Sequence, residues 1–456
     1  MNKNVCRPTS ACEPAHGIQD DKKPVEYHPV RVRLVTIIVT GICVLVNFTD
    51  GFDLVAMAVA APLIAAEFAL TPTILGFLFS AALVGMAVGA MVLSPLGDRV
   101  GRKRTLTCSV ALVSVAMAAT GVSHSLILLI LLRFVTGVGV GGVLGSASSL
   151  VSEFAPEKFR SLLVIVSATG FTAGTVVVGP VASIIIEVAG WRGVFFAGAV
   201  LGALAGILVV LFLPESPEYL ARSGGGTAST LNQVNRIRDR MGLAGLSDIS
   251  PPRASKSPFG PGVGTLLSAG QRPKTLMIWG LLFSSFWTSY FLINWTPQLL
   301  VLAGFSLNNS IIALSLITFG GLVAAWLVGA VSSRWPLGQT ITLLLIASVV
   351  VMVIYAMTKP TTPSLVMAAM FLVGFTVNGA LTALYGLVAV AYPLEFRSTG
   401  IGWALGVGRL GAIASPVAGG FMVEMGIGMH GLLILLAVPM SVAGAVLAWL
   451  VSRQVH

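Results

Sequence analysis

Residues 34–60 read LVTIIVTGICVLVNFTDGFDLVAMAVA, an apolar run in which Asp50 and Asp53 are the only charged side chains. A run of this length can cross roughly 30 Å of hydrocarbon as a helix. Each aspartate costs about 2.5–3.5 kcal/mol at the centre of a membrane-spanning helix. Their i, i+3 spacing places both carboxyls on one helical face. A chain that carries this cost twice is predicted to use the two groups to bind a cation, a proton or a counter-charge.

Apolar runs of similar length recur throughout the 456 residues, of which 56% are hydrophobic and 10% are charged. An ordinary globular chain has about 25% charged residues. The runs lack the period-2 alternation of a membrane β-barrel, so they predict an all-α membrane protein. We expect twelve transmembrane helices, at residues 34–60, 74–96, 105–122, 126–149, 162–188, 193–213, 275–303, 310–331, 337–357, 365–391, 399–425 and 431–451.

The net charge of +10 can be explained by how the basic residues are distributed among the loops between these spans. Arg192 and Lys359 are the only lysine or arginine residues in the loops of one side, and Arg133 and Arg409 lie within spans. Every other lysine or arginine falls on the opposite side, which is therefore predicted to be the cytoplasm, with both termini in it. Membrane topology thus accounts for the basic charge, and we expect no nucleic-acid partner. His124 and His430 fall in the sparsely charged loops and are interpreted as surface residues.

The series of spans is interrupted once, by a polar segment rich in glycine and proline that reads as a linker. The first thirty residues lack the apolar core of a signal peptide, so they are predicted to be a tail. Cys6, Cys12 and His16 in that tail have no common metal-site spacing, and we expect neither a metal nor a cofactor. The predicted domains are a tail (1–33), a six-helix half (34–213), a linker (214–274), a second six-helix half (275–451) and a tail (452–456).

The two halves carry matching signals. The tripeptide FRS occurs at 159–161, before the fifth span, and again at 396–398, before the eleventh. A repeat at equivalent positions indicates duplication of a six-helix unit. In transporters of this architecture, the two halves rock around a site held between them at the bilayer midplane.

The loop between the second and third spans reads GDRVGRKR over residues 97–104. Its glycine allows a tight turn, and Asp98 can pair with helix ends or neighbouring arginines when that side is closed. Asp98, Arg99 and Arg102 are therefore gate candidates, although the loop could also be a basic anchor that only sets orientation. Charged residues at helix ends on the same side could form gate ion pairs, or they could be solvated loop charge; they are Glu153, Arg160, Glu395 and Arg397.

Together with the twelve spans and the duplication, this loop resembles that of the major facilitator superfamily, over nearly the whole chain. The stretch RFVTGVG at 133–139 is similar to the superfamily's R-x-x-x-G-x-G motif. The second copy of the loop, SSRWP at 332–336, has lost its aspartate and its glycines, so symmetric gating is in doubt. The resemblance implies the major facilitator fold.

The DGFD element at 50–53, with EFAPEKFR at 153–160, resembles a narrower group, the aromatic acid:proton symporters of bacteria. That resemblance implies a carrier in the bacterial inner membrane that imports a benzoate- or hydroxybenzoate-class acid by proton symport and supplies aromatic catabolism. The expected partners are this small acid, protons and the lipid bilayer, and we expect the carrier to work as a monomer.

Four ionisable side chains lie well inside spans, namely Asp50, Asp53, Arg133 and Arg409. We expect Asp50 or Asp53 to bind the coupling proton, and Arg409 or Arg133 to bind the substrate carboxylate, whose two oxygens suit a guanidinium fork. One monoanion moving with one proton carries no net charge, so transport would draw on the pH difference. The alternative is that the acids and arginines only pair with each other to hold the bundle together.

The seventh span offers candidates for binding a ring. Five of its residues recur at helical spacing on one face, and aromatic faces stack on ring substrates. Lipid-facing or packing aromatics are the alternative explanation. The residues are Phe283, Phe286, Trp287, Tyr290 and Asn294, with Asn378, Tyr385 and Trp403 as weaker candidates.

The sequence leaves other functions open. A carrier on the same scaffold could transport a non-aromatic organic acid, a sugar or an exported drug. A membrane enzyme or sensor fits less well, because the sequence has no nucleotide-binding loop, metal-spacing cluster or nucleophile motif. A passive channel also fits poorly, since a two-fold repeat within one chain favours rocking halves.

Overall fold

The structure is a computed structural model that describes residues 34–223, 227–241, 263–268, 272–331, 334–392 and 397–454. These residues form α-helices and one short 3₁₀ turn, η1 (Glu157–Phe159), and none of them is in a strand. The prediction of an all-helical protein is therefore confirmed for the part of the chain that is described.

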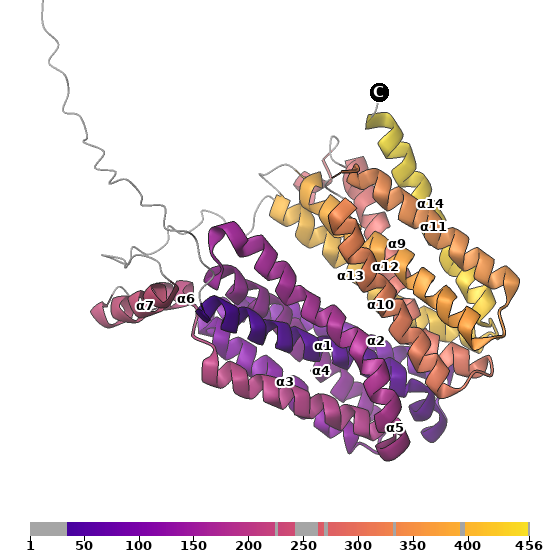
Figure 1. Cartoon of the computed structure of the whole chain (residues 1–456), viewed down its shortest axis with the longest axis horizontal. Helices are drawn as coiled ribbons and strands as arrows, with labels where there is room; N and C mark the ends of the chain where they lie inside the picture. Colours follow the sequence, from indigo (N-terminus) through magenta and orange to yellow (C-terminus); the bar gives the residue numbers. More distant parts are fainter. Residues whose placement is uncertain are drawn as a thin grey trace, which may run out of the picture.

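Eleven of the described helices are long and apolar enough to cross a membrane. The first group is α1 (Leu34–Glu67), α2 (Pro72–Val100), α3 (Arg102–Gly121), α4 (Leu126–Phe154) and α5 (Arg160–Phe212). The second group is α9 (Arg272–Leu302), α10 (Leu307–Val331), α11 (Leu337–Thr358), α12 (Pro363–Ala391), α13 (Arg397–Glu424) and α14 (Met429–Gln454). Figure 1 shows the first group packed on one side of the molecule and the second group on the other.

Helix α5 contains two of the predicted spans. A straight helix of its 53 residues would be about 80 Å long, more than twice the hydrocarbon thickness. Gly190 interrupts it with φ 63° and ψ −169°, a backbone conformation that essentially only glycine adopts. Figure 1 shows the two arms meeting at the label α5. The spans predicted at 162–188 and 193–213 are therefore two helices that meet at Gly190 within α5, so the eleven long helices account for the twelve predicted spans.

Two short helices, α6 (Pro217–Ser223) and α7 (Ala228–Met241), follow α5 and lie beside one end of the first group (Figure 1). We call this end of the molecule the linker side and the opposite end the far side. A further short helix, α8 (Val263–Leu266), precedes α9.

The two groups are joined near the far side. Helix α2 lies against α13, and α10 lies against α5. The Ser80 hydroxyl donates to the Ile413 carbonyl at 2.7 Å, and the Thr318 hydroxyl donates to the carbonyl of Thr175 at 3.2 Å. Closer to the far side, the hydroxyl of Thr73 donates to the carboxylate of Glu424. These contacts close the seam between the groups toward the far side.

Gly76 tests this closure. A Cβ at Gly76 would lie 2.5 Å from the backbone oxygen of Pro416 in the other group. We expect Gly76→Ala to disfavour the closed seam by about 1–3 kcal/mol, as overpacking does in tight cores. A single cysteine at Thr73 should then react faster with a hydrophilic maleimide. Gly41→Ala is the matched control, since no atom lies within 4 Å of its added Cβ. Equal labelling rates in the two variants would contradict the closure.

Candidate functional site

A buried ion pair links α1 to α4. Arg133 donates from Nη1 to Oδ1 of Asp53 at 2.8 Å, and both side chains are almost fully buried. Its Nη2 donates to the hydroxyls of Thr120 and Thr136, at 3.1 and 3.2 Å. The guanidinium also lies over the ring of Phe195, with 4.9 Å between its carbon and the ring centroid. The charge of Arg133 and both of its terminal nitrogens, Nη1 and Nη2, are therefore engaged within the first group of helices.

Asp50 lies one turn before this pair and has no comparable partner. It is 1% exposed, and its Oδ2 has no hydrogen-bond partner among the described residues. A buried carboxylate without a partner is costly, whereas a protonated carboxyl avoids most of that cost. Of the two predicted acids, the structure thus pairs Asp53 with an arginine and leaves one oxygen of Asp50 without a partner.

A small cavity of about 20 Å³ connects these groups to the other half of the molecule. Asp50, Asp53 and Arg133 line it from α1 and α4, and Asn294 lines it from α9. The Asn294 amide donates to the Tyr290 carbonyl at 2.7 Å. This volume can hold about one water molecule and cannot hold an aromatic ring. The acids are thus next to the seam and in contact with the predicted ring-binding helix.

The ion pair carries a stability prediction. Asp53→Asn leaves the Arg133 charge buried without its counter-charge, which is expected to cost about 3–5 kcal/mol. The variant should unfold at a clearly lower temperature than the parent protein in detergent. Adding Arg133→Gln removes the orphaned charge and should recover part of the loss. A single variant as stable as the parent protein would show that the pair does not hold α1 to α4.

The predicted ring-binding residues lie together on α9, facing α12 and α13. Phe286 stacks on Tyr290 with 5.9 Å between centroids, and it meets Tyr385 of α12 edge-on at 6.1 Å. Phe283 and Trp287 pack against each other at 5.8 Å. Tyr385 keeps 45% of its surface exposed, although it lies within a predicted span.

Arg409 of α13 follows Gly408, which packs against the Phe286 ring of this cluster. Its Nη1 is buried and has no hydrogen-bond partner among the described residues. Arg133 also leaves its Nε without a partner, but its Nη1 is paired with Asp53.

The weaker candidates take different positions. The Ser289 hydroxyl donates to Oδ1 of Asn378 at 2.5 Å, which joins α9 to α12. Trp403 is 47% exposed and stacks on Trp279, with 6.1 Å between ring centroids. These residues flank the aromatic cluster, and the described contacts do not place them against Arg409.

Several predicted gate residues meet on the linker side. Arg102 pairs with Asp98 at 3.2 Å and also contacts the Glu153 carboxylate at the end of α4. Ser216, in the segment after α5, donates from its hydroxyl to Glu153 at 2.5 Å. Glu218 of α6 approaches Arg102 at 3.6 Å. The loop between α2 and α3 is thereby tied to the ends of α4 and α5.

The sequence model of the Major Facilitator Superfamily matches residues 43–393, which is most of the chain. The chain belongs to this superfamily. The xylose transporter XylE of Escherichia coli, solved in a partially occluded inward-open conformation, superposes with a TM-score of 0.69 at 16% identity. That superposition covers 90% of this chain and 96% of XylE, and it confirms the predicted fold.

Several relatives within the superfamily are named as transporters of aromatic acids. The chain is 31% identical to the 4-hydroxybenzoate transporter PcaK of Acinetobacter baylyi, over 91% of both chains. It is 30% identical to the gallate transporter of Pseudomonas putida, over 87% of this chain and 88% of the relative. It is also 30% identical to the benzoate transport protein of Acinetobacter baylyi, over 95% and 92%. The resemblance to aromatic acid carriers is therefore confirmed, and the chain is a multi-pass membrane transporter.

The superfamily loop has one partner that the sequence analysis missed. Glu215 accepts hydrogen bonds from the backbone N–H groups of Lys103 and Ser216, at 2.9 and 3.0 Å. Gly101 has φ +116°, and a Cβ there would lie 2.6 Å from the Glu215 carboxylate. Glu215 therefore caps the start of α3 and needs the glycine beside it. The sequence feature that could have pointed to Glu215 is its position between two prolines, in PESP at 214–217.

The remaining predicted gate residues are not part of this network. Arg99 is exposed in the last turn of α2, and Arg160 is exposed at the start of α5. Glu395 lies outside the described residues, and for Arg397 only the backbone, at the start of α13, is described. Their gating roles stay predictions.

Proposed function

We propose that this protein is a proton-coupled importer of an aromatic carboxylic acid of the benzoate and hydroxybenzoate class, working by alternating access. The observation that carries the proposal is the division of charge across the seam. One half holds a buried acid without a full set of partners, and the other holds an arginine with a free donor on a helix that packs against the aromatic cluster. The names of the relatives support the substrate class.

Asp50 is proposed to bind the coupling proton. Asp53 is already neutralised by Arg133 at 2.8 Å. An ionised Asp50 beside it would be an unpaired buried charge, which the membrane interior disfavours. Taking up a proton removes that charge, and releasing it requires access to water. Protonation at Asp50 can therefore favour one arrangement of the halves over the other.

Arg409 is proposed to bind the substrate carboxylate, with the α9 rings against the substrate ring. Its free Nη1 can donate to one carboxylate oxygen, and a charge-assisted bond of this kind is stronger than a neutral one. Tyr290 and Tyr385 both contact Phe286, the ring against which the neighbouring Gly408 packs. A sugar has no carboxylate for this arginine, and a cationic drug would be repelled by it.

The two sites are proposed to be coupled through α9. Asn294 lines the cavity at the acids, and Tyr290, one turn earlier on the same helix, stacks in the aromatic cluster. A change at the acids therefore reaches the ring site through a single turn of helix. The linker side, where most basic residues lie, is proposed to face the cytoplasm. The seam in the present conformation is then closed toward the outside.

Uptake by proteoliposomes tests this function. Labelled 4-hydroxybenzoate should accumulate when the outside is made acidic, and the accumulation should collapse when a protonophore removes the pH difference. A membrane potential imposed at equal pH should drive little uptake if one proton moves with one monoanion. Counterflow by xylose or a cationic drug, without any response to ring acids, would overturn the proposal in favour of another cargo.

A further inference from the structure

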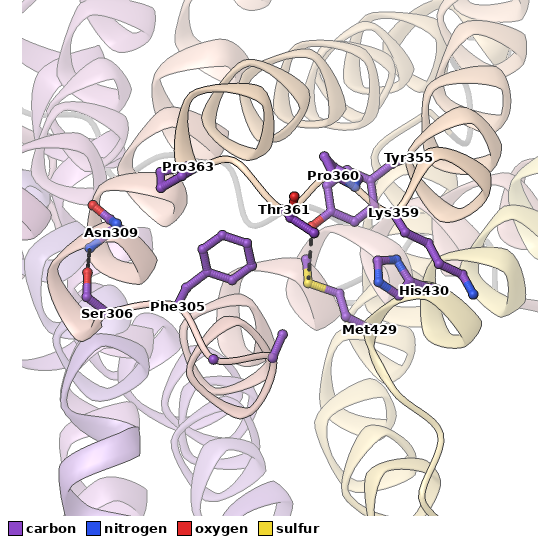
Figure 2. Close-up of a pocket in the computed structure, with 12 residues that line it drawn as sticks. Phe305, Ser306, Asn309, Tyr355, Lys359, Pro360, Thr361, Pro363, Met429 and His430 are labelled. Carbon is purple, nitrogen blue, oxygen red and sulfur yellow. Dashed lines mark hydrogen bonds between the residues drawn. The ribbon is translucent and has the colours of Figure 1, made fainter.

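A second and larger cavity, of about 400 Å³, lies at the far side of the second group of helices. It forms where the loops after α9 and α11 meet the start of α14 (Figure 2). All its lining residues lie between 303 and 430, so it is separate from the cavity at Asp50. Its volume is within the range of pockets that bind small molecules, about 300–1,000 Å³.

The walls of this far-side pocket include two aromatic rings. Figure 2 shows Phe305 on one side of the space, with Tyr355, Met429 and His430 on the other. Phe305 packs against the core, and its backbone N–H donates to Leu300 at 3.0 Å. Tyr355 is buried, with its ring 5.7 Å from that of His430. Both walls are therefore held in place by packing before any ligand arrives.

The pocket is also positive at one end. None of its twelve lining residues is acidic, and Lys359 supplies a positive charge. Burial and the Lys359 charge lower the pKa of His430, so its imidazole contributes ring nitrogens rather than a second charge. Helices α10, α12 and α14 all begin around it, at Leu307, Pro363 and Met429, and helix N-termini favour anions. The pocket therefore pairs an apolar interior with a rim suited to a negative charge.

Two polar groups in the pocket lack good partners. His430 is half-buried, and its Nδ1 is covered and has no hydrogen-bond partner among the described residues. His430 therefore lies in the wall of this surface pocket. The Tyr355 hydroxyl donates to the Met429 sulfur at 3.7 Å, and a thioether is a weak acceptor. Both groups can interact with a carboxylate without giving up a strong bond.

Lys359 is held at the rim by an uncommon backbone conformation. It has φ 44° and ψ 58° where α11 ends, the left-handed region that non-glycine residues rarely enter. Its N–H donates to the Tyr355 carbonyl at 3.1 Å, and Pro360 follows it. Figure 2 shows its side chain running past the His430 ring.

We propose that the far-side pocket is a second binding site for a small aromatic carboxylate. The ring would lie between Phe305 and Tyr355, and the carboxylate would face His430 and Lys359. This site would take its ligand from the outer solution while the seam is closed on that side. The choice of an aromatic acid as ligand rests on the proposed function, although the pocket itself does not involve Arg409 or the acids.

Cysteine protection tests the site on the purified full-length chain in detergent. The four native cysteines are replaced by serine, and Thr361, which lines the pocket and is exposed, is changed to cysteine. Benzoate at ten times its dissociation constant should slow maleimide labelling about tenfold, because the label reacts only with the free pocket. Thr362→Cys is the matched control, being exposed next to the pocket without lining it, and its labelling should not change.

Further variants separate this site from the central one. Lys359→Asn, combined with His430→Ala, should abolish protection, and asparagine tolerates the left-handed backbone at this position. Protection should persist in Arg409→Ala, which removes the proposed central carboxylate site. Acetate and benzyl alcohol should each protect poorly, since one lacks the ring and the other lacks the charge.

The proposal is overturned if benzoate does not protect Thr361→Cys, if acetate protects equally, or if protection is lost in Arg409→Ala but kept in the Lys359 and His430 variant. Uptake by the unmodified carrier decides the proposed function independently. Protection without any uptake of ring acids would leave the pocket standing and remove the transport proposal.

Discussion

An Asp50→Asn variant is expected to exchange labelled 4-hydroxybenzoate across a membrane but not to accumulate it. Asparagine resembles the protonated carboxyl and cannot release a proton, so the link to the pH difference is lost. One pH unit per proton corresponds to about 1.4 kcal/mol and can support up to about tenfold accumulation. In the variant the ratio of inside to outside concentration should fall to about one, while counterflow from preloaded vesicles continues.

The control for this experiment is Glu187→Gln, which removes an exposed carboxylate near the far side of α5. It should accumulate substrate as the parent protein does. If Asp50→Asn still pumps uphill with the same pH dependence, the proton site lies elsewhere, and Asp53 becomes the next carboxyl to test. Loss of both exchange and accumulation, with normal folding, would assign Asp50 to substrate movement rather than to proton coupling.

Arg409→Ala should have the largest effect on substrate affinity. Removing one partner of a buried charge pair costs about 2–5 kcal/mol, which corresponds to a rise in the dissociation constant of about 30-fold to several thousand-fold. Arg409→Lys keeps the charge without the planar fork, so it should fall between the alanine variant and the parent protein. Quenching of tryptophan fluorescence by 4-hydroxybenzoate measures the affinity, since Trp287 lies on the proposed ring-binding helix.

Arg334→Ala is the matched control, because that arginine is exposed on the linker side. Its affinity should match that of the parent protein. An unchanged affinity in Arg409→Ala would contradict the assignment and move the carboxylate site to Arg133. Arg133 would then have to leave Asp53 and the two threonine hydroxyls during the cycle.

The sequence predicted the helices well because each crossing needs an apolar run, and such runs can be counted. It did not predict that the fifth and sixth spans would meet directly at Gly190 without a loop, because that junction depends on the φ and ψ of Gly190 rather than on hydropathy. The i, i+3 spacing of Asp50 and Asp53 predicted that they share one helical face, and both line one cavity. Their different partners could not be read from spacing, because they depend on which acid α4 brings Arg133 against.

The aromatic face of α9 shows the same limit. Its periodicity predicted that Phe286, Tyr290 and Asn294 share one side of a helix, and the structure stacks Phe286 on Tyr290 within the second group and places Asn294 at the seam. The role of α13 was less visible, because Arg409 is close to the α9 rings only after the helices have packed. Glu215 was hidden for a different reason: it lies in a segment read as flexible linker, and its contacts are with a loop far away in the chain.

The separation of the buried acids from the aromatic cluster has an evolutionary consequence. The groups proposed to harness the ion gradient lie on α1 and α4, whereas those proposed to choose the cargo lie on α9, α12 and α13. Mutations in the second half of the gene can then change which compound is transported. The coupling to the ion gradient, which the first half encodes, is inherited unchanged. A hybrid gene joining the first half of this carrier to the second half of a gallate carrier would be a natural starting point for such diversification.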